Sequence, residues 1–147
     1  MSRGLGDVYK RQVPFEDKEE VEEVAKKYGV DVISMISPTS EERIARIAKE
    51  ATGFIYVVSS MGVTGVRSEI HTDLAKIIEK IRSVTDVPCA IGFGISTPEQ
   101  AERMAALADG AIVGSAIVKI VAEYKEEAAQ PLYDYVASMK QAVLAAR

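Results

Sequence analysis

Two kinds of apolar pattern alternate along this chain from residue 14 onward. One repeats every three or four positions, as on the buried face of an amphipathic helix. The other is a short continuous apolar run, typical of a strand buried on both faces. Helices are expected over 17–28, from 39 to just before Gly53, around 74–81, after Thr97, from about Ser115 and around 132–143, and strands within 30–37, 54–60, 89–94 and 111–113.

Start and stop residues support these helix boundaries. Gly29 and Gly53 follow two of the periodic segments, where glycine favours a left-handed helix end. Thr97 with Gln100 forms a predicted capping box, and Pro98 between them suits the first helical position. Another capping box is predicted at the second helix. Its members are Thr39 and Glu42.

The alternation of helix and strand predicts an α/β fold with a parallel sheet of four strands, each followed by a helix, and one helix before them. Because the strands read as continuous apolar runs, either helices cover both faces of the sheet or a barrel closes. Four of the expected helices have one apolar face each, and these faces comprise Val21, Val24, Ala25 and Tyr28; Ile44, Ile47, Ala48 and Ala51; Leu74, Ile77, Ile78 and Ile81; and Leu132, Tyr135, Val136, Met139 and Val143.

The composition narrows the class of protein. With 147 residues and 48% hydrophobic content, the chain is large enough for one globular domain with a core, and no run is long enough to span a membrane. A net charge of -4 offers no basic surface for nucleic acid. The single cysteine, Cys89, excludes an intramolecular disulfide, lies in an apolar run that predicts core packing, and fits a reducing cytoplasm.

The first twelve residues, MSRGLGDVYKRQ, differ from the rest of the chain. They show neither a helical nor a strand period, and they lack the apolar segment of a secretory signal. We therefore expect residues 1–12 to be a non-native or disordered leader, followed by one domain over residues 13–147.

Two glycine turns carry the first functional signal. In AIGFGIST, Gly92 and Gly94 stand between a predicted strand and a helix start, where their N–H groups could approach an anion. An ordinary tight turn is the alternative for either glycine pattern alone. One strand and helix later, VGS at 113–115 heads a short extra helix. Adjacent turns of this kind reproduce the phosphate site that TIM barrels build after their last two strands.

A third loop follows the strand FIYVV and belongs to the same edge of the sheet. Its sequence SSMGVTGVRSE supplies Gly62, Thr64 and Gly65 within four residues, and it is long for a minimal connection. Such a loop suits a lid or substrate clamp, with a solvated connector as the alternative.

Together, GFIYVVSSMGVTGVR, AIGFGISTPEQ and DGAIVGSAIVKIV closely resemble, in order and spacing, the C-terminal half of the tryptophan synthase alpha chain. The resemblance runs from about Val13 to the last residue. It implies strands 5 to 8, with the preceding helix, of a (β/α)₈ TIM barrel. It also implies a lyase that cleaves indole-3-glycerol phosphate to indole and glyceraldehyde 3-phosphate in tryptophan biosynthesis.

The resemblance assigns roles to individual positions. It implies phosphate binding at Gly65, Gly94, Gly114 and Ser115, mostly through backbone N–H groups. It places Phe93 and Ile112 in the pocket lining, Tyr56 beside the substrate, and Thr64 in a lid that orients a catalytic aspartate. No catalytic role falls on His71, which with Arg67 and Glu69 is expected at the solvated edge of the lid.

The resemblance also implies a partner and the location of the cofactor. Family members pair with a beta chain, in an alpha2beta2 heterotetramer, and that chain carries pyridoxal phosphate. We expect this chain to hold no cofactor and no metal, and to bind neither nucleic acid nor a membrane.

Departures from the family pattern limit this interpretation. Gln12 stands where the family's D-x-P-x-E segment has aspartate, and the glutamate and aspartate that act as general acid and base fall in the half that this chain lacks. We therefore expect the chain alone to be inactive. A non-catalytic half-barrel that binds phosphate or a partner, or another phosphate-binding TIM-barrel enzyme, remains the alternative.

Overall fold

The computed structural model describes residues 15–59 and 67–146, with backbone only at residues 16 and 67–73. The predicted leader, residues 1–12, lies outside this part. The described elements, in chain order, are η1 (Phe15–Asp17), α2 (Glu19–Lys27), β1 (Ser34–Ile36), α3 (Glu41–Lys49), β2 (Ile55–Val58), α4 (Arg67–Arg82), β3 (Cys89–Gly92), α5 (Pro98–Ala105), β4 (Gly110–Ile112), α6 (Ser115–Tyr124), η2 (Lys125–Glu127) and α7 (Ala129–Ala145).

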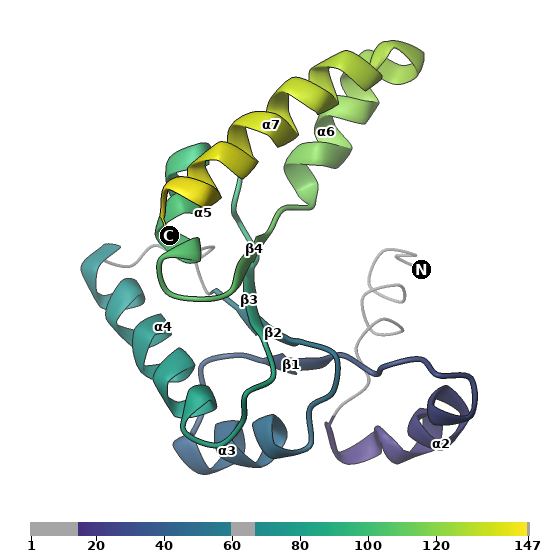
Figure 1. Ribbon diagram of the computed structural model, residues 1–147, viewed down its shortest axis with the longest axis vertical. Coiled ribbons are helices and arrows are strands. Elements are labelled where there is room, and N and C mark those ends of the chain that lie inside the picture. Colours follow the sequence, from purple (N-terminus) through teal and green to yellow (C-terminus); the bar gives the residue numbers. More distant parts are fainter. Residues whose placement is uncertain (1–14, 60–66, 147) are drawn as a thin grey trace, which may run out of the picture.

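The strands form one parallel sheet in the order β1-β2-β3-β4, so each strand pairs with the next along the chain. Each strand is followed by a helix, and α2 precedes the first strand. The predicted α/β fold with four parallel strands is therefore confirmed. In Figure 1 the helices α3, α4, α5 and α7 lie along one side of this sheet.

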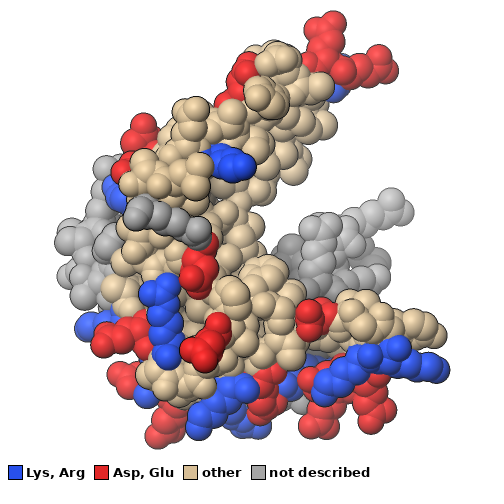
Figure 2. Space-filling view, viewed as in Figure 1, with Lys and Arg blue, Asp and Glu red and all other residues tan. Residues whose placement is uncertain are grey.

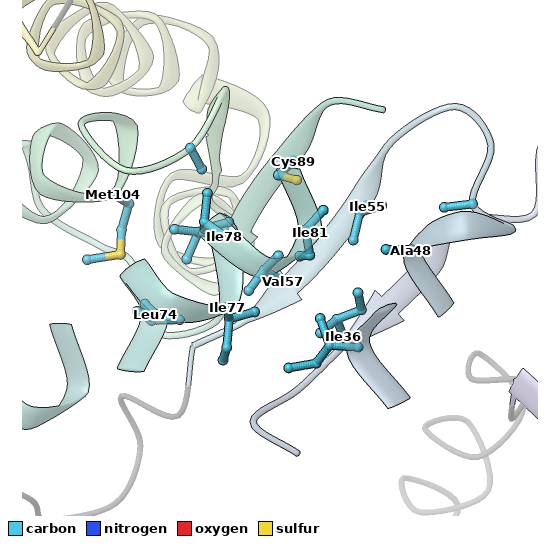
Figure 3. Close-up of a cluster of buried hydrophobic side chains, with 14 of the residues drawn as sticks. Ile36, Ala48, Ile55, Val57, Leu74, Ile77, Ile78, Ile81, Cys89 and Met104 are labelled. Atoms are coloured by element: carbon cyan, nitrogen blue, oxygen red, sulfur yellow. The ribbon is translucent and has the colours of Figure 1, made fainter. Parts of the chain in front are cut away.

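The core lies between the sheet and these helices. Alternate strand residues point into it, and the apolar faces predicted for α3 and α4 are buried against them. Figure 3 shows strand side chains such as Ile55 and Val57 gathered with Ile77 and Ile81 of α4. Cys89 is part of the same cluster, which confirms its prediction as a core residue.

The other face of the sheet has no such cover among the described residues. Four strand residues on this face are only partly buried: Tyr56, Val58, Ala90 and Ile112. Their chain neighbours on the other face, such as Val57 and Ile91, are fully buried. Helices on both faces, one of the two predicted alternatives, is therefore wrong for this part of the chain. An apolar face left open is what a barrel that closes with further strands requires.

The start of α3 and the burial of α2 differ from the sequence prediction. Ser40, and not Thr39, caps α3: its hydroxyl accepts a hydrogen bond from the Arg43 N–H at 3.4 Å, and its carbonyl accepts one from Ile44. The capping box with Glu42 is therefore wrong, because the helix starts one residue later. The apolar face of α2 is also not buried, with Tyr28 72% exposed.

Other helix ends follow the sequence prediction. Gly29 and Gly53 both have positive φ, at 66° and 67°, as the left-handed stops require. The capping box of α5 is present with both of its hydrogen bonds, from Thr97 and Gln100, and Pro98 occupies the first turn. In the described part of the chain, no helix has the length and apolar character needed to cross a membrane.

Candidate functional site

The candidate site lies at the carboxyl ends of β2, β3 and β4. Strand register places Val58, Gly92 and Ile112 side by side in the last row of the sheet. Paired residues of parallel strands point to the same face, so this row belongs to the open face. The two glycine turns follow it directly, and the segments predicted to bind phosphate are therefore neighbours in space.

Tyr56 covers the end of β3. A Cβ atom added to Gly92 would overlap the Tyr56 hydroxyl and ring, so the Tyr56 side chain lies across that glycine on the open face. Glycine is needed here because any side chain would displace the tyrosine. The prediction that Gly92 stands after the strand with N–H groups exposed to an anion is wrong, since Gly92 is the last residue of β3 and is buried.

The turn after β3 has an unusual backbone. Phe93 has a φ of 87°, a left-handed conformation that residues with a side chain seldom adopt, and Gly94 has a φ of 77°. The Phe93 side chain is 62% exposed at the edge of the sheet. Glycine is needed at position 94, because only glycine adopts this φ without strain.

The two helices that start at this edge differ in how their first N–H groups are satisfied. At α5 the Thr97 hydroxyl accepts from the Gln100 N–H at 3.3 Å, and the Gln100 side chain accepts from Thr97 and Ser96. At α6 the N-cap is Gly114, which has no side-chain cap, and the first turn carries no acidic residue. The start of α6 therefore keeps donors and positive dipole potential for an anion.

Space at the start of α6 is open. A Cβ added to Gly114 would meet no atom within 4 Å, and Ser115 is exposed beside it. α6 itself buries none of its residues, and its Val118 is 67% exposed. In Figure 2 the surface over α6 and α7 is largely uncharged, whereas charged side chains gather along α2 and α3 and at the far end of α6.

α7 supports the β3 turn from the outer side. The Tyr135 hydroxyl donates to the Ser96 carbonyl at 2.9 Å, which ties α7 to the loop before α5. Partial burial of the Tyr135 hydroxyl raises its pKa above the usual range. A cavity of about 290 Å³ lies beside it, lined mainly by apolar residues of β4, α5, α6 and α7.

Two groups on β3 and α5 have shifted pKa values, the Cys89 thiol and the Glu99 carboxyl. Burial raises the pKa of the Cys89 thiol, with the nearby Asp109 carboxylate as a second cause, so the thiol stays protonated in the core. Hydrogen bonds from its own backbone N–H and from Thr97 lower the pKa of Glu99 at the start of α5. Within the described ranges, no group of three histidine, cysteine or acidic residues could hold a metal ion.

Of the predicted site residues, the structure brings six to one edge of the sheet: Tyr56, Phe93, Gly94, Ile112, Gly114 and Ser115. Thr64 and Gly65 lie outside the described residues, as do the side chains of Arg67, Glu69 and His71. The sequence analysis missed two hydrogen bonds at this edge, from the Ser59 hydroxyl to the Phe93 carbonyl and from the Tyr135 hydroxyl to the Ser96 carbonyl. A serine directly after an apolar strand was the available signal for Ser59.

Comparisons with known proteins agree on one family. The family model of the tryptophan synthase alpha chain matches residues 8–145. The tryptophan synthase alpha chains of Lacticaseibacillus casei and Lactiplantibacillus plantarum are each 50% identical to this chain over 131 and 132 residues. Those matches cover 89% of this chain but 49% and 50% of the relatives, so the chain spans about half their length.

Solved structures give the same result. Tryptophan synthase subunit alpha from Campylobacter jejuni superposes with a TM-score of 0.78 at 31% identity, over 87% of this chain and 51% of that one. The alpha chain from Legionella pneumophila superposes with a TM-score of 0.72 at 32% identity, over 90% and 49%. The four strands with their helices are thus half of a (β/α)₈ barrel.

Proposed function

This chain belongs to the tryptophan synthase alpha chain family, and we propose that it supplies the phosphate-binding half of a lyase that cleaves indole-3-glycerol phosphate to indole and glyceraldehyde 3-phosphate. The observation that carries the proposal is the uncapped start of α6 beside the left-handed turn after β3. Both lie at the carboxyl edge of the sheet, where barrels of this class bind phosphate.

The phosphate group is proposed to bind to backbone N–H groups of Gly94, Gly114 and Ser115, with Gly65 as a fourth contributor. An anion at this place gains from the dipole of α6 and meets no side chain at Gly114. Because α5 is already capped by its own side chains, α6 is the better of the two helix starts for this role.

The indole part of the substrate is proposed to lie over the open face. Tyr56 and Ile112 belong to that face, and Phe93 stands exposed at its edge. Thr64 is proposed to act from the loop after β2. Seven residues make up the two open rows nearest the site, and none of them is a carboxylate, a histidine or a lysine: Met35, Tyr56, Val58, Ala90, Gly92, Gly110 and Ile112.

The acid and base are therefore proposed to come from the other half of the barrel. Cleavage needs a base at the indole nitrogen and an acid at the ring carbon, since the carbon fragment leaves only after the indole tautomerises. Such groups typically supply about 10² to 10⁴-fold each. We propose a beta chain as the partner that receives the indole and holds pyridoxal phosphate, and the cytoplasm as the compartment.

Complementation tests the catalytic proposal. Indole release is measured from this chain alone, then after addition of the N-terminal half of the Lacticaseibacillus casei alpha chain. We expect turnover only in the mixture. Turnover by this chain alone would overturn the assignment of the acid and base to the other half. A mixture that assembles and binds substrate without turnover would contradict the proposed reaction.

A charge-specific pair of variants tests the phosphate site. Gly114→Asp and Gly114→Asn add side chains of nearly equal size at a position with free space, and only the first is negative. We expect the aspartate variant to bind inorganic phosphate at least tenfold more weakly than the asparagine variant, as followed by amide chemical shifts of Ser115. Equal binding by the two variants would contradict an anion at this place.

A further inference from the structure

Ser59 is a buried polar residue beside the candidate site. It follows β2 directly and has no exposed surface, and it is the single polar or charged residue found buried in the described part of the chain. Its N–H donates to the Gly92 carbonyl at 2.9 Å. Its hydroxyl lies 2.7 Å from the Phe93 carbonyl oxygen and 2.9 Å from that of Gly92, so it donates to the turn after β3.

The turn that Ser59 contacts needs an anchor. Phe93 adopts a φ of 87°, a backbone conformation that is unfavourable for a residue with a side chain. Without a contact that holds it, the backbone at Phe93 would relax to a negative φ. On the far side of the turn, Ile95 is buried in the core. The segment 93–95 is therefore held at its first residue by Ser59 and at its last residue by the burial of Ile95. Gly94 between them is exposed to solvent.

The hydrogen bond also fixes the direction of the next N–H group. In a planar trans peptide the C=O and N–H bonds point in opposite directions, and no described peptide bond is cis. Because the Phe93 carbonyl points to the Ser59 hydroxyl, the Gly94 N–H points away from Ser59. That N–H is therefore turned out of the buried strand end.

We propose that Ser59 is a positioning residue for phosphate binding: by holding the Phe93 carbonyl, it keeps the turn left-handed and presents the Gly94 N–H to the phosphate. The inference rests on the proposed phosphate site. Ser59 does not contact the ligand, and its effect passes through the peptide plane between Phe93 and Gly94. The alternative is a serine that merely satisfies carbonyls in the core, with no influence on the turn.

Three variants of this chain separate these roles. Ser59→Ala removes the hydroxyl. Ser59→Ala with Phe93→Gly removes it but relieves the turn, since glycine adopts positive φ without strain. Ser83→Ala is the matched control, because the Ser83 hydroxyl also lies 2.7 Å from a carbonyl, that of Lys80, at the distant end of α4.

Two readouts are taken on each variant by NMR. The strength of the HN–Hα contact within residue 93 reports positive φ, and amide shifts of Gly94 and Ser115 during titration with inorganic phosphate report binding. We expect Ser59→Ala to lose the positive-φ signature and to bind phosphate at least tenfold more weakly. The double variant should recover most of the binding, and Ser83→Ala should match the unsubstituted chain.

Each other outcome is decisive. A folded Ser59→Ala chain that keeps positive φ at Phe93 and full phosphate affinity would overturn the proposal. If Ser59→Ala does not fold, a folded and binding double variant supports it, and a double variant that also fails overturns it. If the unsubstituted chain binds no phosphate, the proposed phosphate site fails, while the φ readout still decides whether Ser59 controls the turn.

Discussion

The two faces of the sheet are built by neighbouring residues of the same strands, yet only one face is buried under helices and forms a core. On the helix-covered face, Val57 and Ile91 have no exposed surface. On the open face, their neighbours Val58 and Ala90 remain partly exposed, although they too are apolar. Both faces carry apolar side chains, but the described part of the chain covers only one of them.

In this half-barrel the helix-covered face contributes mainly to stability, and the open face carries the proposed binding site. The helix-covered face holds the strands in register without contributing to the site. The open face carries Tyr56 and Ile112, and the turns at its edge carry the proposed phosphate ligands. Substitutions on the first face should therefore act on the free energy of unfolding, and those on the second should act mainly on ligand binding.

Truncation of a large side chain on each face gives the largest expected difference. Ile91→Ala opens a cavity against the helices and should cost about 2–5 kcal/mol in free energy of unfolding. Met35→Ala on the open face should cost less than about 1 kcal/mol, because Met35 is already 37% exposed. Urea unfolding of both variants measures the two costs. Comparable costs would show that the open face is packed in solution.

A methyl group at Gly92 should disturb the open face at one point. Gly92→Ala forces the added Cβ into the Tyr56 side chain and should cost about 1–3 kcal/mol. Adding Tyr56→Ala removes the clash. The loss in free energy of unfolding of the double variant should therefore be about 1 kcal/mol smaller than the sum of the two single losses. Thermal unfolding of the four chains gives this coupling. Additive costs would mean that Tyr56 does not lie across Gly92.

The smallest effect concerns pH on the covered face. Burial raises the pKa of Cys89, so the folded chain binds the thiol proton more tightly than the unfolded chain. The resulting stabilisation is complete below the ordinary thiol pKa and is lost as the pH rises through the raised value. The free energy of unfolding should thus fall more between about pH 7 and about pH 9.5 in the unsubstituted chain than in Cys89→Ala. Parallel pH dependence in both chains would contradict burial of the thiol.

Most of the fold could be predicted from the sequence, because helix and strand periods differ and the apolar faces of α3 and α4 are continuous. The capping box of α5 was predictable because its hydrogen bonds join residues three apart. The start of α3 was missed by one residue, since Thr39 and Ser40 offer equivalent hydroxyls and only the backbone decides between them.

The candidate site could be predicted less completely. Repeated glycines marked the turns, and resemblance supplied the roles proposed for Tyr56 and Ser115. The roles of Ser59 and Tyr135 were missed because their hydrogen bonds join residues more than thirty positions apart. Ser59 donates to the Phe93 carbonyl and Tyr135 to the Ser96 carbonyl. The covering role of Tyr56 over Gly92 was hidden for the same reason, as strand register alone brings these residues together.

Identical substitutions at adjacent positions of β2 decide whether one face of the sheet is a packed core while the other is open. Val57→Ala and Val58→Ala each remove the same atoms, from the covered and the open face. We predict a loss of about 2 kcal/mol in the free energy of unfolding for Val57→Ala and less than half of that for Val58→Ala, measured by urea unfolding. Equal losses at the two positions would mean that both faces of the sheet are packed alike.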